Sequence, residues 1–241
     1  MIDLISTIFF DMGGTLRRNT PRDLETQAVI TQQILDVLGV SNSTGDFATK
    51  LAARADAYEE WAATTLNELD ETHLWTEWML PDYPPEKITP IALQLSEIWR
   101  EAIATRVLFP ETVPVIRALH QKGYRLGLIS NTTSHTDALA MLGKAGIASL
   151  FEVVLLSCVF GRRKPDPAIL VEAATRMGVP PRQCAYIGDR ADWDVLAARR
   201  AGYGKVVLMC DPAIPNPLLV SPDLVPDHFI HNLQELPALF P

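Results

Sequence analysis

The chain has 241 residues, of which 48% are hydrophobic and 21% are charged, a balance typical of a folded globular protein. The formal net charge of −8 argues against a nucleic acid or an anionic membrane as a partner, because both attract clusters of Lys and Arg. Charged residues or prolines interrupt every long apolar stretch before it could span a membrane. We therefore expect a soluble, cytoplasmic protein, either a monomer or a homodimer.

The cysteines and the N-terminal residues favour the same location. Cys158, Cys184 and Cys210 are far apart, lie in apolar runs and form no CxxC pair. We expect reduced thiols rather than disulfides or a zinc site. The apolar start of the chain has no basic leader and soon reaches Asp11, so we expect neither a signal peptide nor a membrane helix.

Charge divides the chain into unequal parts. Residues 17–105 carry 7 basic and 15 acidic side chains, whereas the remainder carries 14 of each. All of the net charge lies in this internal segment, which indicates a separate unit. Its apolar residues recur at helical spacing from a start at Thr20–Asp23 to an end near Arg106, and four of the five tryptophans lie in it. We predict a helical bundle over 17–106, with the tryptophans in its core or lining a substrate pocket.

The residues on either side of this segment predict a different architecture. Short apolar runs alternate there with amphipathic helices, which is the pattern of a buried parallel sheet with helices on both faces. We expect a doubly wound α/β core from residues 1–16 and 107–241, into which residues 17–106 are inserted as an all-helical domain. Strands are predicted at 4–10, 124–129, 152–156, 185–187, 205–209 and 228–230, helices at 111–122, 134–145, 165–177 and 192–201, and an irregular Pro-rich connection at 211–227.

Polar residues gather where the predicted strands end. Ligands of open parallel sheets bind at the carboxyl ends of the strands, so we expect these residues to converge. The four segments are Asp11-Met12-Gly13-Gly14-Thr15, Ser130-Asn131, Arg162-Arg163-Lys164-Pro165, and Gly188-Asp189 with Asp194.

The chemistry of this set is that of phosphoryl transfer. Asp11, Asp189 and Asp194 would form an all-oxygen, carboxylate-rich site that suits Mg²⁺ rather than zinc. Lys164 and the Ser130 hydroxyl can hold the charge of a phosphate. One carboxylate is then able to attack phosphorus and form an aspartyl-phosphate. No nucleophile elbow, P-loop or dinucleotide-binding fingerprint competes with this interpretation.

These motifs resemble those of the haloacid dehalogenase (HAD) superfamily, in its subgroup with a helical cap. In that family a hydrophobic strand ends in Asp-x-Asp-Gly-Thr, matched here by Asp11–Thr15, and a second strand ends in Ser or Thr, matched by Ser130. Its Lys, commonly in Lys-Pro-Asp-Pro, is matched by Lys164–Pro167, and its Gly-Asp with a further Asp by Gly188–Asp194. The resemblance covers essentially the whole chain and implies a Rossmann-like core whose cap closes over the crevice and selects the substrate.

The resemblance also implies roles for individual residues. Asp11 resembles the nucleophile, and Lys164 resembles the residue that balances charge on it. The implied reaction is the Mg²⁺-dependent hydrolysis of a small phosphorylated metabolite through an aspartyl-phosphate. The implied metal ligands are Asp11, the Gly13 carbonyl, Asp189 and, directly or through water, Asp194, and the implied phosphate-binding residues are Gly14, Thr15, Ser130 and Asn131.

Gly13 departs from the family pattern. Phosphatases of the family have an Asp at this position, which protonates the leaving oxygen and later activates water. Such general acid–base help is typically worth about 10²–10⁴ in rate. Three interpretations stay open: a phosphatase that is slow or recruits another acid, such as His135 or His73; a phosphonate-cleaving enzyme; or a protein that binds a phosphate ligand without turnover.

The phosphonate-cleaving branch of the family has a small residue at this position and uses a cap lysine to form an imine. Only Lys50 and Lys87 are available in the predicted cap, and the residues around Lys50 do not match that branch. A dehalogenase is less favoured, because that branch dispenses with Mg²⁺ and this chain retains the Asp pair. Arg17 and Arg18, just after the first motif, are candidates for binding a second anionic group of the substrate.

Overall fold

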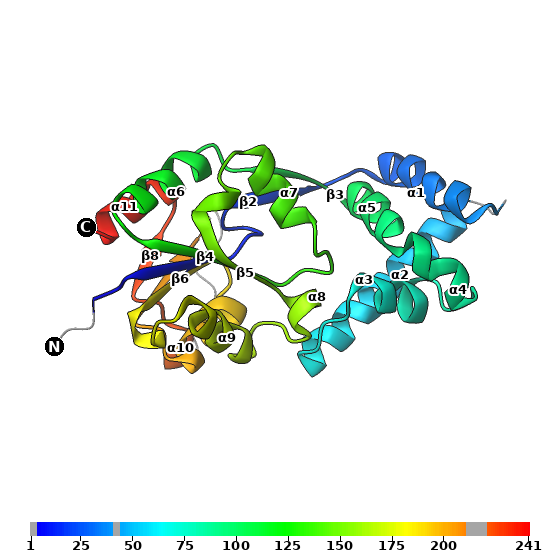
Figure 1. Ribbon diagram of the computed structural model, residues 1–241. Coiled ribbons are helices and arrows are strands. Elements are labelled where there is room, and N and C mark those ends of the chain that lie inside the picture. Colours follow the sequence, from blue (N-terminus) through cyan, green and yellow to red (C-terminus); the bar gives the residue numbers. More distant parts are fainter. Residues whose placement is uncertain (1–3, 41–43, 211–220) are drawn as a thin grey trace.

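The computed structural model describes residues 4–40, 44–210 and 221–241, and Figure 1 shows a sheet flanked by helices beside a lobe of helices. Within the described residues the main sheet is six-stranded and parallel, in the order β5-β4-β1-β6-β7-β8. The predicted doubly wound α/β fold is confirmed. The strands are β1 (Thr7–Phe10), β4 (Arg125–Ser130), β5 (Phe151–Leu156), β6 (Cys184–Gly188), β7 (Lys205–Met209) and β8 (His228–Ile230).

Strand β1 lies in the interior of the sheet because it is apolar on both faces. Ile8, Phe9 and Phe10 are completely buried. Successive side chains of a strand point to opposite faces, so Ile8 and Phe10 join one apolar core and Phe9 joins the other. The next residue, Asp11, is therefore held at the middle of the carboxyl edge. The first core is covered by α6 (Thr112–Gln121), α7 (Asp137–Lys144) and α11 (Leu236–Leu239), and the second by α9 (Ala168–Met177) and α10 (Leu196–Ala201).

The helical lobe has an apolar core of its own, separate from the two that flank the sheet. Trp75 is 1% exposed in this core, and Trp61, Trp78 and Trp99 pack against it while partly buried. We propose residues 17–106 as the cap domain. Its helices are α1 (Leu24–Leu38), α2 (Thr44–Thr65), α3 (Glu71–His73) with the π-helical turn Leu74–Met79, α4 (Pro85–Ile88) and α5 (Ala92–Ile103).

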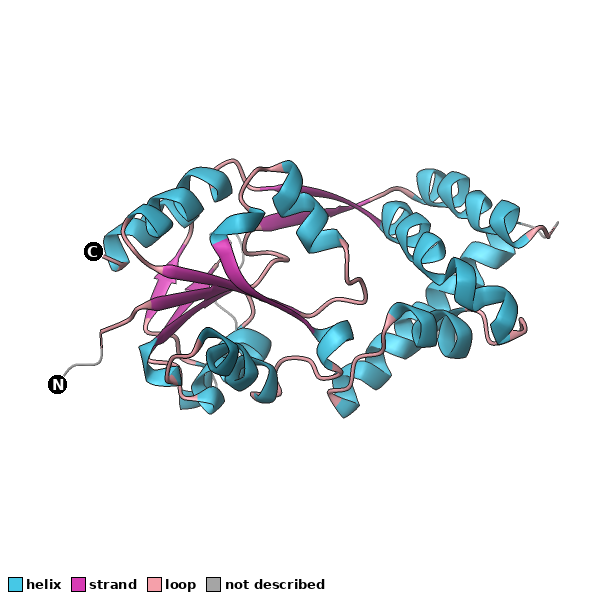
Figure 2. Ribbon diagram, viewed as in Figure 1, coloured by secondary structure: helices cyan, strands magenta, loops and turns pink. Residues whose placement is uncertain are grey.

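The expectation that this segment is helical from end to end was wrong. Its two ends form an antiparallel ribbon of β2 (Arg17–Pro21) and β3 (Ala104–Leu108), which runs from the sheet to the helices (Figure 2). Helix α1 accordingly starts later than predicted, with Asp23 as its N-cap accepting a hydrogen bond from the Thr26 backbone N–H. The ribbon pairs residues that are far apart in the sequence, and local apolar spacing carries no signal for such pairing.

Three helices in the core also begin away from the predicted residues. Helix α7 begins at Asp137 rather than 134, and α9 begins at Ala168 rather than 165, after the short helix α8 (Ser157–Phe160). A π-helical turn at Ala191–Val195 precedes α10. In each case residues predicted as the first helical turn belong instead to the loop or turn that follows a strand end.

Other expectations concern location and the thiols. No helix in the described part of the chain is long and apolar enough to cross a bilayer. Cys158 and Cys184 are buried, and burial raises the pKa of each thiol to about 12. Most of the predicted Pro-rich connection lies outside the described residues, which resume at 221.

The core of the cap contains one polar pair that can be tested. Trp75 donates its indole N–H to the Ser96 hydroxyl at 2.7 Å, and both residues are buried. Ser96→Ala would leave the indole N–H unpaired, so we expect a loss of about 1–3 kcal/mol in the free energy of unfolding, measured by urea denaturation. In the double variant Trp75→Phe/Ser96→Ala the loss should be smaller than the sum of the two single losses. Strict additivity would show that this hydrogen bond contributes nothing.

Candidate active site

The carboxyl ends of β1, β4 and β6 open into one cavity of about 360 Å³. Asp11 follows β1, Ser130 ends β4 and Asp189 follows β6, while Lys164 comes from the loop before α9. All four residues line this cavity. They meet because parallel strands present their carboxyl ends at the same edge of a sheet.

Lys164 connects two of these loops through its ammonium group. Its Nζ donates to Oδ1 of Asp11 and to Oδ1 of Asp194, both at 2.6 Å, and to the Tyr186 hydroxyl at 2.8 Å. Lys164 is only 2% exposed. Burial lowers the pKa of the ammonium, but the adjacent Asp11 and Asp194 carboxylates outweigh burial, so the net pKa is raised and Lys164 stays charged.

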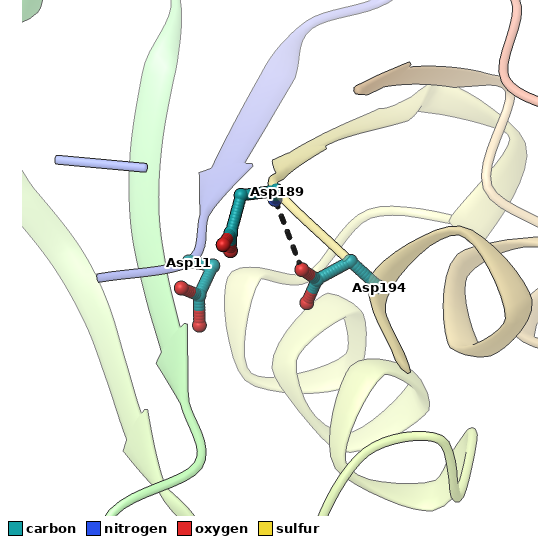
Figure 3. A group of neighbouring side chains, drawn as sticks. All are labelled: Asp11, Asp189 and Asp194. Atoms are coloured by element: carbon teal, nitrogen blue, oxygen red, sulfur yellow. Dashed lines mark hydrogen bonds between the residues drawn. The ribbon is translucent and has the colours of Figure 1, made fainter. Parts of the chain in front are cut away.

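Asp194 uses both carboxylate oxygens for contacts within the protein. Oδ2 accepts the backbone N–H of Asp189 at 3.1 Å (Figure 3). Oδ2 also accepts the backbone N–H of Arg190 at 3.0 Å, and Oδ1 accepts from Lys164. The carboxyl group can approach this closely because residue 188 is a glycine, where a Cβ would lie only 2.4 Å from the Asp194 side chain. Asp194 thus fixes the loop that carries Asp189.

Asp189 has the weakest hydrogen bonding to its side chain of the three carboxylates in the site. Its one side-chain partner among the described residues is the Thr15 hydroxyl, at 3.5 Å from Oδ1. It packs against the backbone of Gly14, which has a φ of +82° and where a Cβ would overlap Oδ2 of Asp189 at 2.0 Å. Burial, together with the negative charges of Asp11 and Asp194, raises the pKa of Asp189 to about 8. Burial likewise raises the pKa of Asp11 to about 6, although Lys164 opposes the shift.

The residues predicted to bind phosphate occupy different positions. Ser130 and Gly14 line the cavity. Asn131 also lines it, but its amide is paired with Lys164, since Nδ2 donates to the Lys164 carbonyl and Oδ1 accepts the Lys164 N–H, both at 2.9 Å. Thr15 is completely buried, and its side chain faces Asp189 rather than the wall of the cavity. Phosphate contacts by these residues stay a prediction.

Gly13 leaves an open position beside Asp11. A Cβ at residue 13 would be 3.6 Å from Nδ2 of Asn19, an ordinary contact, and the backbone there does not require glycine. The two candidate replacement acids lie elsewhere. His135 pairs with Glu71 and His73 pairs with Asp70, and neither histidine lines this cavity.

A second cavity of about 410 Å³ adjoins the first and extends under the helical lobe. Arg17, Asn19, Asn131 and Trp193 line both cavities, so the two lie side by side. Trp99 lines the second cavity, and a role of this cavity in binding substrate stays a prediction.

Several lining residues gave no usable sequence signal. Tyr186 lies in the middle of a buried strand and resembles a core residue, yet its hydroxyl accepts a hydrogen bond from Lys164. Asn19, Arg100 and Arg106 belong to no motif and reach the second cavity only through the fold of the inserted segment.

Comparison with known proteins identifies the family to which this arrangement of strand-end residues belongs. A family model described as haloacid dehalogenase-like hydrolase matches residues 5–202. The chain belongs to this family. The predictions of a HAD-like protein and of a hydrolase are thereby confirmed.

The relatives of this HAD-like hydrolase include phosphatases. It is 30% identical to a phosphoglycolate phosphatase of Salmonella typhimurium over 98% of this chain and 92% of the relative. It is 36% identical to a glyceraldehyde 3-phosphate phosphatase of Methanopyrus kandleri, over 39% of this chain and 40% of the relative. The solved 2-haloacid dehalogenase from Pseudomonas syringae pv. Tomato DC3000 shares the fold with a TM-score of 0.68, at 21% identity and 98% coverage of both chains.

The acidic cluster of this HAD-like hydrolase fits a hard divalent cation. Asp11, Asp189 and Asp194 each offer an oxygen, and these oxygens lie within 4.8 Å of one another (Figure 3). Lys164 supplies one positive charge against three carboxylates, so negative charge remains uncompensated, which contributes to the raised pKa of Asp189. An all-oxygen set of this charge suits Mg²⁺. Because the oxygens of Asp194 already accept hydrogen bonds, Asp11 and Asp189 are the better direct ligands.

The raised pKa values predict a pH-dependent response to Mg²⁺. A raised carboxyl pKa means that the folded state binds protons more tightly than the unfolded chain, so this site lowers stability as the pH rises from about 4 to 8. Mg²⁺ at 100 times its Kd should restore about 2.7 kcal/mol, or roughly 5–10 °C in Tm. The gain should be larger near pH 8 than near pH 5, because protons compete with the metal.

Asp189→Asn is the matched control for this experiment. Without Mg²⁺ the variant should be more stable than the parent near pH 8, because one buried negative charge is gone, and added Mg²⁺ should not raise its Tm. Equal Mg²⁺ stabilisation of parent and variant would contradict the assignment of Asp189 as a ligand.

Proposed function

We propose that this chain is a Mg²⁺-dependent phosphatase that hydrolyses a small phosphorylated metabolite through an aspartyl-phosphate on Asp11. The observation that carries the proposal is the Asp11 carboxylate itself, held by Lys164 at 2.6 Å and facing Asp189 in a cavity that Ser130 also lines. The phosphatase names of the relatives support the same reaction class.

In this proposal Asp11 attacks the phosphorus atom of the bound ester, and the bond between phosphorus and the leaving oxygen breaks. Water then attacks the same phosphorus, which releases inorganic phosphate and regenerates the Asp11 carboxylate. The Lys164 ammonium remains beside Asp11 and offsets its charge while the phosphate dianion approaches. Asp11, Asp189 and the Gly13 carbonyl would hold the Mg²⁺, with Asp194 behind Asp189. Bound there, Mg²⁺ supplies Lewis-acid stabilisation of the phosphoryl oxygens.

Gly13 determines which esters suit this site. Residue 13 supplies no carboxyl group to protonate the leaving oxygen, and the amide of Asn19 lies nearest to its open side. An amide donates a hydrogen bond but does not transfer a proton at neutral pH. We therefore infer a preference for esters whose leaving oxygen is weakly basic, or proton transfer from water.

The phosphonate-cleaving alternative finds no support in the positions of the cap lysines. Lys50 binds Asp82 at 2.5 Å with its side chain 54% exposed, and Lys87 is exposed as well. Neither lines the two cavities. The alternative of binding without turnover is addressed by the loss of activity expected of the nucleophile variant.

Asp11→Asn should abolish turnover. An amide is a poor nucleophile toward phosphorus, so we expect kcat to fall by at least about 10³-fold on small phosphate esters with Mg²⁺ present. Rapid acid quench of the parent with a ³²P-labelled ester should trap label on Asp11, and the variant should trap none. Arg18→Ala, on an exposed residue outside both cavities, is the control that should keep the parent rate. A parent that binds esters but never releases phosphate would contradict the proposal.

Gly13→Asp should restore the missing acid. The open space at residue 13 accepts a side chain, and Nδ2 of Asn19 can hydrogen-bond to the new carboxyl group. We expect kcat/KM to rise about 10- to 100-fold for alkyl phosphates, whose leaving oxygen is strongly basic, and to change little for aryl phosphates with weakly basic leaving groups. Gly13→Asn is the matched control, because it adds the same volume without an acid. Equal effects of the two substitutions would show that proton transfer does not limit the reaction.

A further inference from the structure

We infer that the substrate carries a second anionic group, a carboxylate or a further phosphoryl group, which binds to a cluster of Arg17, Arg100 and Arg106 at the junction of the two cavities. This inference rests on the proposed phosphatase function, because the cavity beside Asp11 would then hold the phosphate undergoing transfer. It names the part of the substrate that the adjoining cavity recognises.

The β2–β3 ribbon brings two of these arginines to one face. In its register Asn19 pairs with Arg106, and Arg17 is two residues before Asn19 on the same strand. Residues paired across the strands, and residues two apart along one strand, share a face. Arg17, Asn19 and Arg106 therefore all reach the second cavity, whereas the intervening Arg18 is exposed and lines neither cavity. Arg100, in α5, completes the cluster from the helical side.

The cluster has more positive than negative charge. Asp137 is its shared carboxylate and contacts both Arg17 and Arg100. Arg106 has no carboxylate within ion-pairing distance among the described residues. Its Nη1 donates only to the backbone carbonyls of Arg100 at 2.6 Å and Ala104 at 3.2 Å.

Two more carboxylates lie near enough to affect the pKa of these arginines, and each is paired with another side chain. The negative charge of Glu71 raises the pKa of Arg100, but the Glu71 carboxylate is paired with His135. The negative charge of Glu101 raises the pKa of Arg106, but the Glu101 carboxylate is paired with Arg22 at 3.2 Å.

Buried donors in the cluster remain unused. Arg17 is only 7% exposed, lines both cavities, and has no hydrogen-bond partner for its Nε among the described residues. Burial and the adjacent positive charge of Arg100 lower the pKa of Arg106 to about 10. A buried guanidinium with unused N–H groups and like-charged neighbours is stabilised by an anion, and its planar donors suit a carboxylate or a phosphoryl group.

Another part of the lining of the second cavity carries net negative charge and forms a wall that would orient the ligand. Glu59 and Glu68 face Arg163 there, with Arg163 bound to both oxygens of Glu59 at 2.6 and 3.0 Å. An anion would be repelled from that wall and directed to the arginines. Arg17 borders the cavity of Asp11 as well, so a compact substrate can reach both sites.

The test compares esters that share a phosphate and differ at the other end. We would measure kcat/KM for 2-phosphoglycolate, for 2-hydroxyethyl phosphate, in which an uncharged hydroxymethyl group replaces the carboxylate, and for 1,2-ethanediol bisphosphate. The parent should prefer at least one of the two doubly anionic esters to the uncharged one by about 10- to 100-fold, the value of one charge-assisted hydrogen bond. The preferred one identifies the second anion.

Arg106→Ala should remove that preference while changing kcat/KM for 2-hydroxyethyl phosphate less than about threefold, and Arg18→Ala should change neither. Equal kcat/KM of the parent for all three esters, or an equal loss on all of them in Arg106→Ala, would overturn the inference while leaving the phosphatase proposal intact. The first comparison needs no variant and so does not depend on whether Arg106→Ala folds.

Calorimetric binding of the same esters separates the two proposals. Tighter binding of a doubly anionic ester that depends on Arg106, without any turnover, would support the anion site and overturn the phosphatase. Binding that is independent of Arg106 and of the second charge would overturn the anion site.

Discussion

The ammonium group of Lys164 is the contact on which the rest of the site depends. It is buried with the carboxylates of Asp11 and Asp194, and it connects loops that follow two different strands. Burying an ammonium is costly unless its hydrogen bonds are complete, and here Tyr186 supplies a third oxygen. Removing Lys164 would leave the buried Asp11 and Asp194 carboxylates without their counter-charge, so the positions of these groups are coupled.

The same contact leaves the site short of positive charge. One ammonium faces three carboxylates, and burial together with the negative charges of Asp11 and Asp194 raises the pKa of Asp189. A phosphate dianion entering this cavity would add further negative charge. The net negative charge of the cluster therefore favours a cation, and it would favour a phosphate only after the cation has bound. This dependence is the physical reason to connect metal binding with the proposed activity.

The inserted segment shows how little net charge says about a local surface. Residues 17–105 hold all of the net negative charge of the chain, yet they contribute Arg17 and Arg100, with Arg106 directly after them, to the cavity beside the proposed phosphate site. Most of the acidic side chains of this segment are exposed to solvent. The net charge of −8 argues against a nucleic acid as a partner, whereas the arginines in the lining of the cavity are complementary to a small anion.

Sequence patterns determined the α/β core and the four loops of the candidate site, because both are encoded locally. Buried strands are continuous apolar runs. Asp11 and Asp189 directly follow such a run, Ser130 ends one, and Lys164 lies in the loop before α9. Knowing that the strands are parallel was enough to place these residues at one edge.

Only the tertiary structure decided the contacts that join distant parts of the chain. The pairing of Asn19 with Arg106, the burial of Tyr186 against Lys164, and the ion pairs of Asp137 with two arginines link residues that no local period connects. The space at Gly13 is of the same kind, because the sequence shows that a carboxyl group is missing but not that Asn19 stands beside the gap. Such contacts depend on how separate elements pack, and packing is a property of the whole fold rather than of any segment.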